Sequence, residues 1–204
     1  MDTLPAQEQS FLLDTDWEGY LKICEVVGER PIKITYDRGL LELMTNSYEH
    51  ESMKTILSTM FEALLVEREI DYLGGGQMTF RRQDLDRGLE PDECYWISHW
   101  KAMRGVREFD SLVHPPPDLV LEIDVTRSSI NRIKMLAAMG VPEVWRYQLK
   151  GALEVRVLEA PGEYKLVEES QVVPGFAPAC LLSFLTEHPD LSISGLVRAF
   201  RRSL

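Results

Sequence analysis

The feature that most constrains the fold is a short segment in the second half of the chain, residues 118–125, with the sequence DLVLEIDV. In an extended strand, successive side chains point to opposite faces of the sheet. One face is then wholly apolar and the other carries three carboxylates: Leu119, Leu121, Ile123 and Val125 lie on the first, and Asp118, Val120, Glu122 and Asp124 on the second. The segment therefore predicts a β-strand that buries one face in a hydrophobic core.

The acidic face of this strand has two interpretations. In a central strand covered on both sides, carboxylates two residues apart on one face are unfavourable unless a cation or a basic group neutralises them. Oxygen ligands at this spacing suit Mg²⁺ or Mn²⁺. In an edge strand, by contrast, solvent would hydrate the acids. The segment alone leaves a cation site and a wetted edge equally open.

The composition is that of a globular protein and predicts a single domain over residues 1–204. The hydrophobic content is 45 %, and 33 acidic against 22 basic side chains give a net charge of −11. This balance argues against a protein that coats nucleic acid through bulk positive charge, because such binding needs many Lys and Arg contacts to phosphates. Disordered and fibrous classes are excluded as well.

The location expected from the sequence is the cytoplasm. No apolar run approaches the roughly 20 residues that cross a bilayer, so no membrane span is expected. The first ten residues do not resemble an export signal. The three cysteines, Cys24, Cys94 and Cys180, have neither disulfide nor zinc spacing, which fits a reducing compartment.

The remaining patterns predict a mixed α/β fold. Three hairpins are expected, each with turn residues between two strand-like runs: 31–36 with 40–44, 78–81 with 90–97, and 153–158 with 163–167. Helical spacing of apolar residues, with capping signals, predicts helices that contain residues 53–65, 128–139 and 191–202. A further strand is expected at 143–147. Strands alternating with helices describe a mixed sheet.

A second acid favours the cation site over the wetted edge. Glu49 lies four residues before Met53, so the apolar stripe of the long helix would carry it toward the sheet. The alternative is a capping box, in which Asn46 caps the helix and Glu49 hydrogen-bonds back to the amide of the cap. His50 also falls near the stripe, where a packed or surface histidine is expected rather than a ligand.

A third acid, Asp92, follows Pro91 at the start of the strand expected at 90–97. A Pro-Asp pair alone usually marks a turn. About thirty residues later come Glu122 and Asp124, which form Glu-x-Asp. Together with Glu49 on the preceding helix, these acids are expected to converge on one site from a helix and two strands.

These segments resemble a known family. The residues that carry the resemblance are 90–97 (EPDECYWI), 116–124 (PPDLVLEID), Ser128-Ser129 and 140–145 (GVPEVW). They are similar to the Uma-type family of restriction-endonuclease-like bacterial proteins, which belongs to the PD-(D/E)xK nuclease superfamily. The similarity runs from the first hairpin to residues 174–176. It implies a restriction-endonuclease-like core: a mixed β-sheet with an N-terminal β-hairpin and flanking α-helices.

The resemblance also implies a metal-dependent DNA endonuclease. A Mg²⁺ or Mn²⁺ ion would be bound by Asp92 and Glu122 and assisted by Glu49. The backbone carbonyl of Ile123 would be a further ligand. Glu49 or Asp124 would orient the attacking water, and a homodimer would supply two sites for cutting both strands.

The chain departs from the superfamily motif at its lysine. The position two after Glu122 is Lys in typical members and is Asp124 here. The family is expected to compensate with a Lys on the next helix, eight residues before Gly140, where this chain has Arg132; the nearest lysine is Lys134. Two residues rotate by about 200° around a helix, so these two side chains cannot both point at the site. Either would hold the scissile phosphate, but Arg cannot readily accept a proton from water.

Two other functions therefore stay open beside the nuclease. The missing strand lysine and the net charge of −11 are compatible with a catalytically impaired nuclease fold that acts as a binding or interaction module. The acidic chain is also compatible with metal-assisted hydrolysis of a small phosphorylated molecule. Four scattered arginines are candidates for guiding a nucleic-acid backbone, or are simply solvated: Arg81, Arg82, Arg87 and Arg127.

Overall fold

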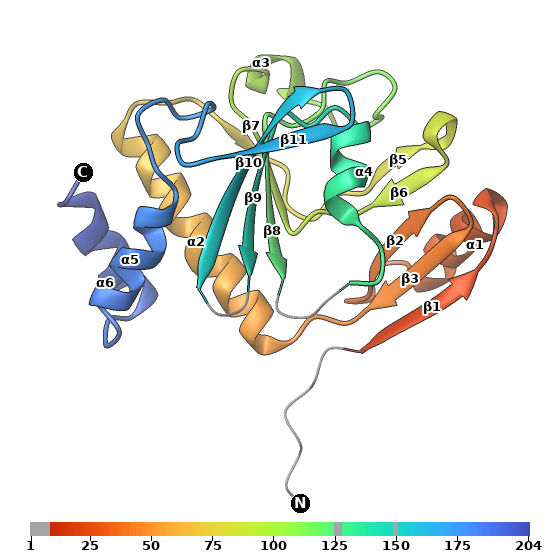
Figure 1. Ribbon diagram of the computed structural model, residues 1–204, viewed down its shortest axis with the longest axis horizontal. Coiled ribbons are helices and arrows are strands. Elements are labelled where there is room, and N and C mark those ends of the chain that lie inside the picture. The colour runs from red at the N-terminus through yellow and green to blue at the C-terminus, as the bar shows by residue number, and fades with distance from the viewer. Residues whose placement is uncertain (1–8, 125–127, 149–150) are drawn as a thin grey trace, which may run out of the picture.

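Two β-sheets lie side by side in the computed structural model, which describes residues 9–124, 128–148 and 151–204 (Figure 1). The first sheet has the strand order β1 (Ser10–Asp14), β3 (Leu40–Met44), β2 (Lys33–Asp37), β6 (Arg87–Leu89) and β5 (Phe80–Arg82). The second sheet has the order β11 (Glu163–Val167), β10 (Ala152–Ala160), β9 (Glu143–Gln148), β8 (Leu119–Asp124), β7 (Glu93–Trp96) and β4 (Leu73–Gly74). The expected mixed α/β class is confirmed.

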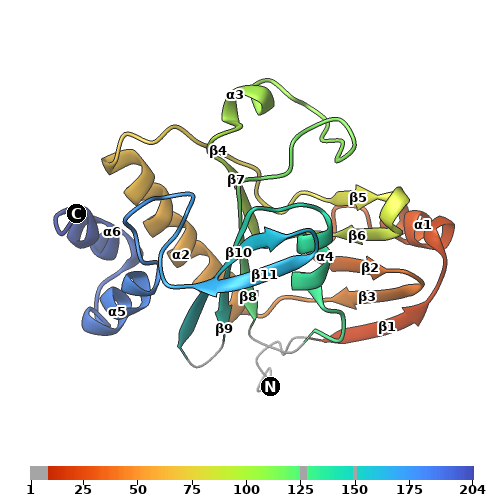
Figure 2. The same ribbon diagram turned by 45° about the horizontal axis from the view of Figure 1, so that its top comes forward.

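Helices cover both sheets. They are α1 (Trp17–Val27), α2 (Tyr48–Glu67), α3 (Trp100–Met103), α4 (Arg132–Ala138), α5 (Ala179–Glu187), α6 (Ile193–Arg201) and a short 3₁₀ helix, η1 (Gln83–Leu85). Figure 2 shows α2, α5 and α6 together on one side of the second sheet, α1 against the first sheet, and α4 where the two sheets meet. Within the described ranges, none of the helices combines the length and the apolar character needed to cross a bilayer.

Strand β8 is central, which decides between the two interpretations of residues 118–125. It pairs antiparallel with β7 on one side and parallel with β9 on the other. Leu121 and Ile123 lie in the same buried cluster as Phe61 of α2, and Glu122 on the opposite face is also buried. The wetted-edge interpretation is therefore wrong, because sheet neighbours and packed layers leave this strand no open edge. Val125, the last residue of the expected strand, lies outside the described residues.

Helix α2 confirms the long amphipathic helix and shows where it begins. Leu57, Met60 and Leu64 are buried at helical spacing against the second sheet. Ser47 is the N-cap, and its hydroxyl accepts a hydrogen bond of 3.1 Å from the amide of His50. The buried positions of the helix set which side chains of its first turn point inward.

The first hairpin is confirmed, and the second has a different partner. β2 and β3 pair antiparallel around Arg38 and Gly39, which both have positive φ, at 48° and 95°. In the second case β5 pairs with β6, closed by Asp86 in the left-handed region, while β7 leaves for the other sheet. Pro91 lies between β6 and β7, where its missing amide hydrogen suits a break in pairing. This crossing brings the two sheets together.

Helix α4 is shorter than the expected helix at 128–139, because it begins at Arg132 after the cap Asn131. Ser128 donates a hydrogen bond to Glu42, and the amide of Ser129 donates another at 3.0 Å. These contacts hold the segment against the first sheet instead of in a helix. The structure confirms β9, the β10–β11 hairpin and α6, and adds β1, α1 and α5, which the sequence patterns did not predict.

Candidate active site

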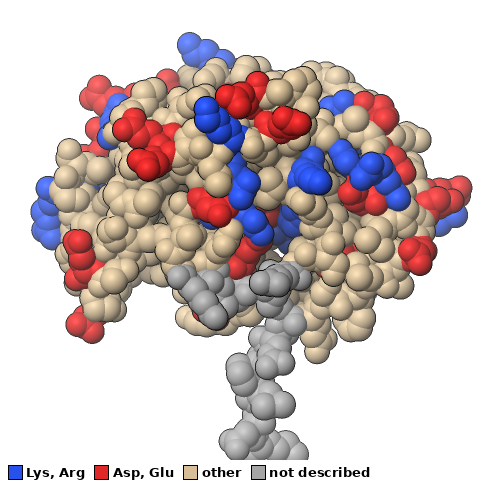
Figure 3. Space-filling model, in the orientation of Figure 1, with Lys and Arg blue, Asp and Glu red and all other residues tan. Residues whose placement is uncertain are grey.

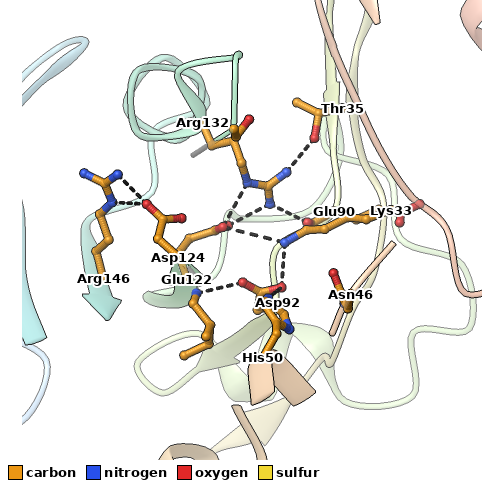
Figure 4. A network of polar contacts seen from close by, with 12 residues as sticks. Lys33, Thr35, Asn46, His50, Glu90, Asp92, Glu122, Asp124, Arg132 and Arg146 are labelled. Atoms are coloured by element: carbon orange, nitrogen blue, oxygen red, sulfur yellow. Dashed lines mark hydrogen bonds and ion pairs between the residues drawn. The ribbon is translucent and has the colours of Figure 1, made fainter. Parts of the chain in front are cut away.

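Asp92 and Glu122 meet where the two sheets join (Figure 4). Asp92 lies just before β7 and Glu122 lies on the neighbouring β8, and their exposed fractions are 0 % and 2 %. The amide of Ile123 donates a hydrogen bond of 2.7 Å to Oδ2 of Asp92, which fixes the loop before β7 against β8. The predicted convergence of these two acids is present in the structure.

A lysine that the sequence did not single out contacts both acids. Lys33 on β2, in the other sheet, places its Nζ 2.5 Å from Oδ1 of Asp92 and 3.8 Å from Oε2 of Glu122. Its exposed fraction is 8 %. One ammonium group is therefore shared by the two carboxylates, so the acids lie close enough to hold a single cation between them.

Arg132, at the start of α4, makes a bidentate pair with Glu122. Its Nε and Nη2 each donate a hydrogen bond of 2.9 Å to the two carboxylate oxygens. The same guanidinium donates to Oγ1 of Thr35 at 2.6 Å and to the carbonyl of Glu90 at 2.5 Å. Burial alone would lower the pKa of Arg132, but attraction to Glu122 outweighs burial and raises it. The side chain is thus a fixed cation that ties α4 to both sheets.

His50 completes the cluster from the first turn of α2. Its Nε2 lies 3.2 Å from Oδ1 of Asp92, and its Nδ1 lies 3.2 Å from Glu51. Burial would raise the pKa of Asp92, yet Lys33, His50 and Arg132 together hold it well below its usual range. Burial would likewise lower the pKa of His50, but the hydrogen bond and the charge of Asp92 raise it.

The prediction that Glu49 points inward is wrong. Glu49 is exposed, whereas the next residue, His50, is only 3 % exposed. The reason is the rotation of α2: Leu57, Phe61 and Leu64 define its buried stripe, and His50, seven residues before Leu57, lies on this stripe, whereas Glu49 is rotated away by about 100°. The capping-box alternative is wrong because the cap is Ser47 rather than Asn46, whose side chain instead donates a hydrogen bond of 2.6 Å to Glu51. The structure does not bring Glu49 to the acid pair.

The other expected site residues lie around the cluster. Asp124, two residues after Glu122 on β8, accepts a hydrogen bond of 2.6 Å from Nε of Arg146 on β9. Lys134 is exposed on α4 and is not in the cluster, as the helix rotation relative to Arg132 required. Ile123 contacts Asp92 through its amide, and a ligand role for its carbonyl stays a prediction.

Two cavities adjoin the cluster. The larger has a volume of about 740 Å³, and Glu122, Asp124 and Arg132 form part of its wall. The smaller, of about 20 Å³, lies among residues that include Lys33, His50 and Glu122. A void of that size holds about one water molecule. A small cation or a water therefore has room directly beside the acids.

The donor set fits one kind of metal site. No group of three or more His, Cys, Asp or Glu side chains that could hold a metal occurs among the described residues. The protein thus offers two carboxylates, Asp92 and Glu122, instead of a complete cage. Mg²⁺ is commonly held by one or two carboxylates together with waters and substrate phosphates. The pair fits such an ion, provided that the Lys33 ammonium gives up its place between the acids.

A mixed sheet with a buried acid pair beside its central strand, reached from a cavity, places this chain in the nuclease-like class of folds. A crystal structure described as "a putative nuclease belonging to DUF820", from Anabaena variabilis ATCC 29413, has this fold: the TM-score is 0.52, the identity is 14 %, and the match covers 89 % of this chain and 98 % of that one. The family model Uma2, described as "Putative restriction endonuclease", matches residues 17–180, and the chain therefore belongs to the Uma2 family. None of the curated proteins matches the chain.

The sequence reasoning missed Lys33 and discounted His50. A signal for Lys33 existed, because it alternates with Ile32 and Ile34 in a predicted strand and so shares a face with Thr35. That pattern places a charged side chain on a strand, but it cannot show that β2 faces β8 across two sheets. Only the packing of the sheets identifies the cation that the acids share.

Proposed function

We propose that this protein hydrolyses phosphodiester bonds in DNA, with Mg²⁺ or Mn²⁺ held between Asp92 and Glu122. The observation that carries the proposal is the Lys33 ammonium, which lies within 3.8 Å of both carboxylates. Two acids that share a monovalent cation at this distance are placed to share a divalent one. Membership of a family described as restriction endonucleases supports the same reaction class.

The chemistry divides between the ion and the side chains. When bound, the ion would polarise a phosphoryl oxygen and lower the pKa of a coordinated water. Lys33 carries its charge on a long flexible stem, so its ammonium can turn from the acids to the substrate phosphate and stabilise the negative charge that develops there. In this role Lys33 replaces the motif lysine that β8 lacks at Asp124.

Arg132 has a positioning role in this proposal. Its four hydrogen bonds, to Glu122, Thr35 and the carbonyl of Glu90, hold the guanidinium in place. It keeps the Glu122 carboxylate oriented in a buried environment. Because Arg stays protonated, it does not serve as the base for the attacking water. The Ile123 amide orients Asp92 in the same way.

Supercoiled plasmid incubated with purified protein and Mg²⁺ or Mn²⁺ tests the proposal. We expect nicked or linear product that disappears with EDTA and with Asp92→Asn. Asp71→Asn is the matched control, because Asp71 is exposed and distant in sequence from the cluster; it should cleave like the unaltered chain. Cleavage that survives Asp92→Asn, or the absence of cleavage on plasmid and single-stranded DNA with both metals, would contradict the proposal.

A further inference from the structure

The cavity of about 740 Å³ beside Glu122 has walls from several elements that are distant in the chain. They come from β8, α4, β9, β10 and β11, so the cavity runs between α4 and the β10–β11 hairpin. Its polar and aromatic lining includes Glu122, Arg132, Lys134, Arg146, Arg156 and Tyr164. Because Glu122 is only 2 % exposed, a substrate would reach it through this cavity.

The lining has one more basic than acidic side chain, although the chain as a whole is acidic. Four of the lining side chains are Lys or Arg and three are Asp or Glu, against a net charge of −11 for the whole chain. Figure 3 shows Lys and Arg side chains in the middle of the face that Figure 1 presents, where they lie in front of β9, β10 and α4. Local positive charge of this kind next to a nuclease-type acid pair favours a phosphate-bearing ligand.

Three of these cations line the cavity beyond the acid cluster. Arg146 and Arg156 have side-chain exposed fractions of 31 % and 21 %, and each is paired with a neighbouring acid, Asp124 and Glu154. Lys134 is exposed, and no ion-pair partner for its ammonium occurs in the part of the chain that the structure describes. A phosphate would therefore meet one unpaired ammonium and two partly exposed guanidinium groups.

The aromatic part of the lining favours an unpaired strand over a duplex. The cavity, of about 740 Å³, lies between α4 and the β10–β11 hairpin. The ring of Tyr164 also forms part of the wall, held by a hydrogen bond of 2.8 Å from its hydroxyl to the carbonyl of Val141. Cationic grooves with aromatic rings are typical of proteins that bind unpaired strands, because only an unpaired base can stack on a ring.

We infer that the cavity binds a single, unpaired DNA strand, with its phosphates along Lys134, Arg146 and Arg156 and a base against Tyr164. The inference rests on the proposed function and specifies its substrate class: the strand that is cut enters the cavity unpaired, at a single-stranded region, a frayed end or a bubble. The path leads the phosphates toward Glu122 at the inner wall.

Binding of labelled oligonucleotides in EDTA tests this inference without cleavage. One strand and its blunt duplex are compared over a range of salt concentrations, with thermal unfolding as a check on folding. We expect tighter binding of the single strand. In the double variant Lys134→Ala/Arg156→Gln, binding should weaken, and the slope of log K against log salt should decrease by about 0.7 for each phosphate that the variant no longer neutralises. Lys165→Ala, on the same hairpin but paired with Glu159 and outside the cavity lining, is the control for a cation lost elsewhere on this face and should behave like the unaltered chain.

The outcomes separate this inference from the proposed function. Equal or tighter binding of the duplex, or a double variant with the affinity and salt slope of Lys165→Ala, would overturn the inference even if plasmid is cleaved. Strand binding that depends on Lys134 and Arg156, with no cleavage under any metal condition, would support the cavity assignment and overturn the proposed nuclease activity instead.

Discussion

Two buried glutamates on neighbouring strands show how differently a carboxylate can be accommodated. Glu122 on β8 and Glu143 on β9 have exposed fractions of 2 % and 1 %. Glu143 accepts hydrogen bonds of 2.6 Å from the indole of Trp145 and from the hydroxyl of Ser170. The amides of Gln171 and Val172 donate two more, at 2.7 and 3.2 Å. Its donors are all neutral.

Glu122 instead has cations as partners. Arg132 holds both of its oxygens, Lys33 lies 3.8 Å away, and the side chain is part of a cavity wall. The hydroxyl of Ser170 and the amides of Gln171 and Val172 are held in place by the Glu143 carboxylate, so Glu143 anchors residues 170–172. A flexible ammonium can be exchanged for another cation. Burial is nearly the same for both acids, so their partners distinguish the structural acid, Glu143, from the one that can bind a ligand, Glu122.

The largest expected effect is on cleavage. Glu122→Gln keeps the shape of the side chain but removes the charge, and we expect DNA cleavage to decrease by more than about 100-fold if Glu122 holds the proposed metal ion, because losing a charged ligand costs several kcal/mol of transition-state stabilisation. Initial rates of plasmid nicking measure this. Glu143→Gln is the matched variant, and its rate per folded molecule should stay close to that of the unaltered chain. Equal losses in both variants would erase the functional distinction between the two acids.

The Glu143 variant should also lower the stability of the protein. In Glu143→Gln the new amide group is a donor placed among donors, so at least one buried hydrogen-bonding group loses its partner. We expect the free energy of unfolding to decrease by about 1–3 kcal/mol. Urea unfolding followed by tryptophan fluorescence measures it. An unchanged midpoint would show that the loop at 170–172 does not depend on this carboxylate.

A smaller effect concerns the pH dependence of the cation-rich cluster. Asp92 raises the pKa of His50 in the folded protein, against the opposing effect of burial. The stabilisation is therefore fully present below the unfolded pKa, about 6.5, and is lost as pH rises through the folded pKa. The difference in unfolding free energy between the unaltered chain and His50→Gln, in EDTA, should be larger at acidic than at alkaline pH. A His50 difference that grows toward alkaline pH would contradict the ion pair with Asp92.

The smallest effect is expected at Glu49, one residue before His50. Because its side chain is exposed, Glu49→Gln should change the free energy of unfolding by less than about 0.5 kcal/mol. Cleavage should stay at the level of the unaltered chain. A loss of cleavage as large as that of Glu122→Gln would show that Glu49 reaches the acid pair in the working enzyme.

Sequence reasoning predicted the elements with strong local patterns and missed those fixed by packing. The strand at 119–124, the helix around Leu57 and the hairpin turn at Arg38-Gly39 follow from alternation, helical spacing and turn chemistry. The buried stripe of α2 was less predictable near its start, because Met53 and Ile56 are only partly buried and the stripe follows Leu57, Phe61 and Leu64, which places His50 rather than Glu49 inward. The pairing of β5 with β6 instead of β7 likewise depends on the whole fold.

By itself the sequence determined which acids share a face of a strand, because side-chain direction within one strand follows from local backbone geometry. It also determined that Arg132 and Lys134 point in different directions on one helix. Only the tertiary structure decided which cation the acids share, since Lys33 is 59 residues from Asp92 and lies in the other sheet. Contacts of that kind arise from how two sheets pack, and no local pattern encodes that packing.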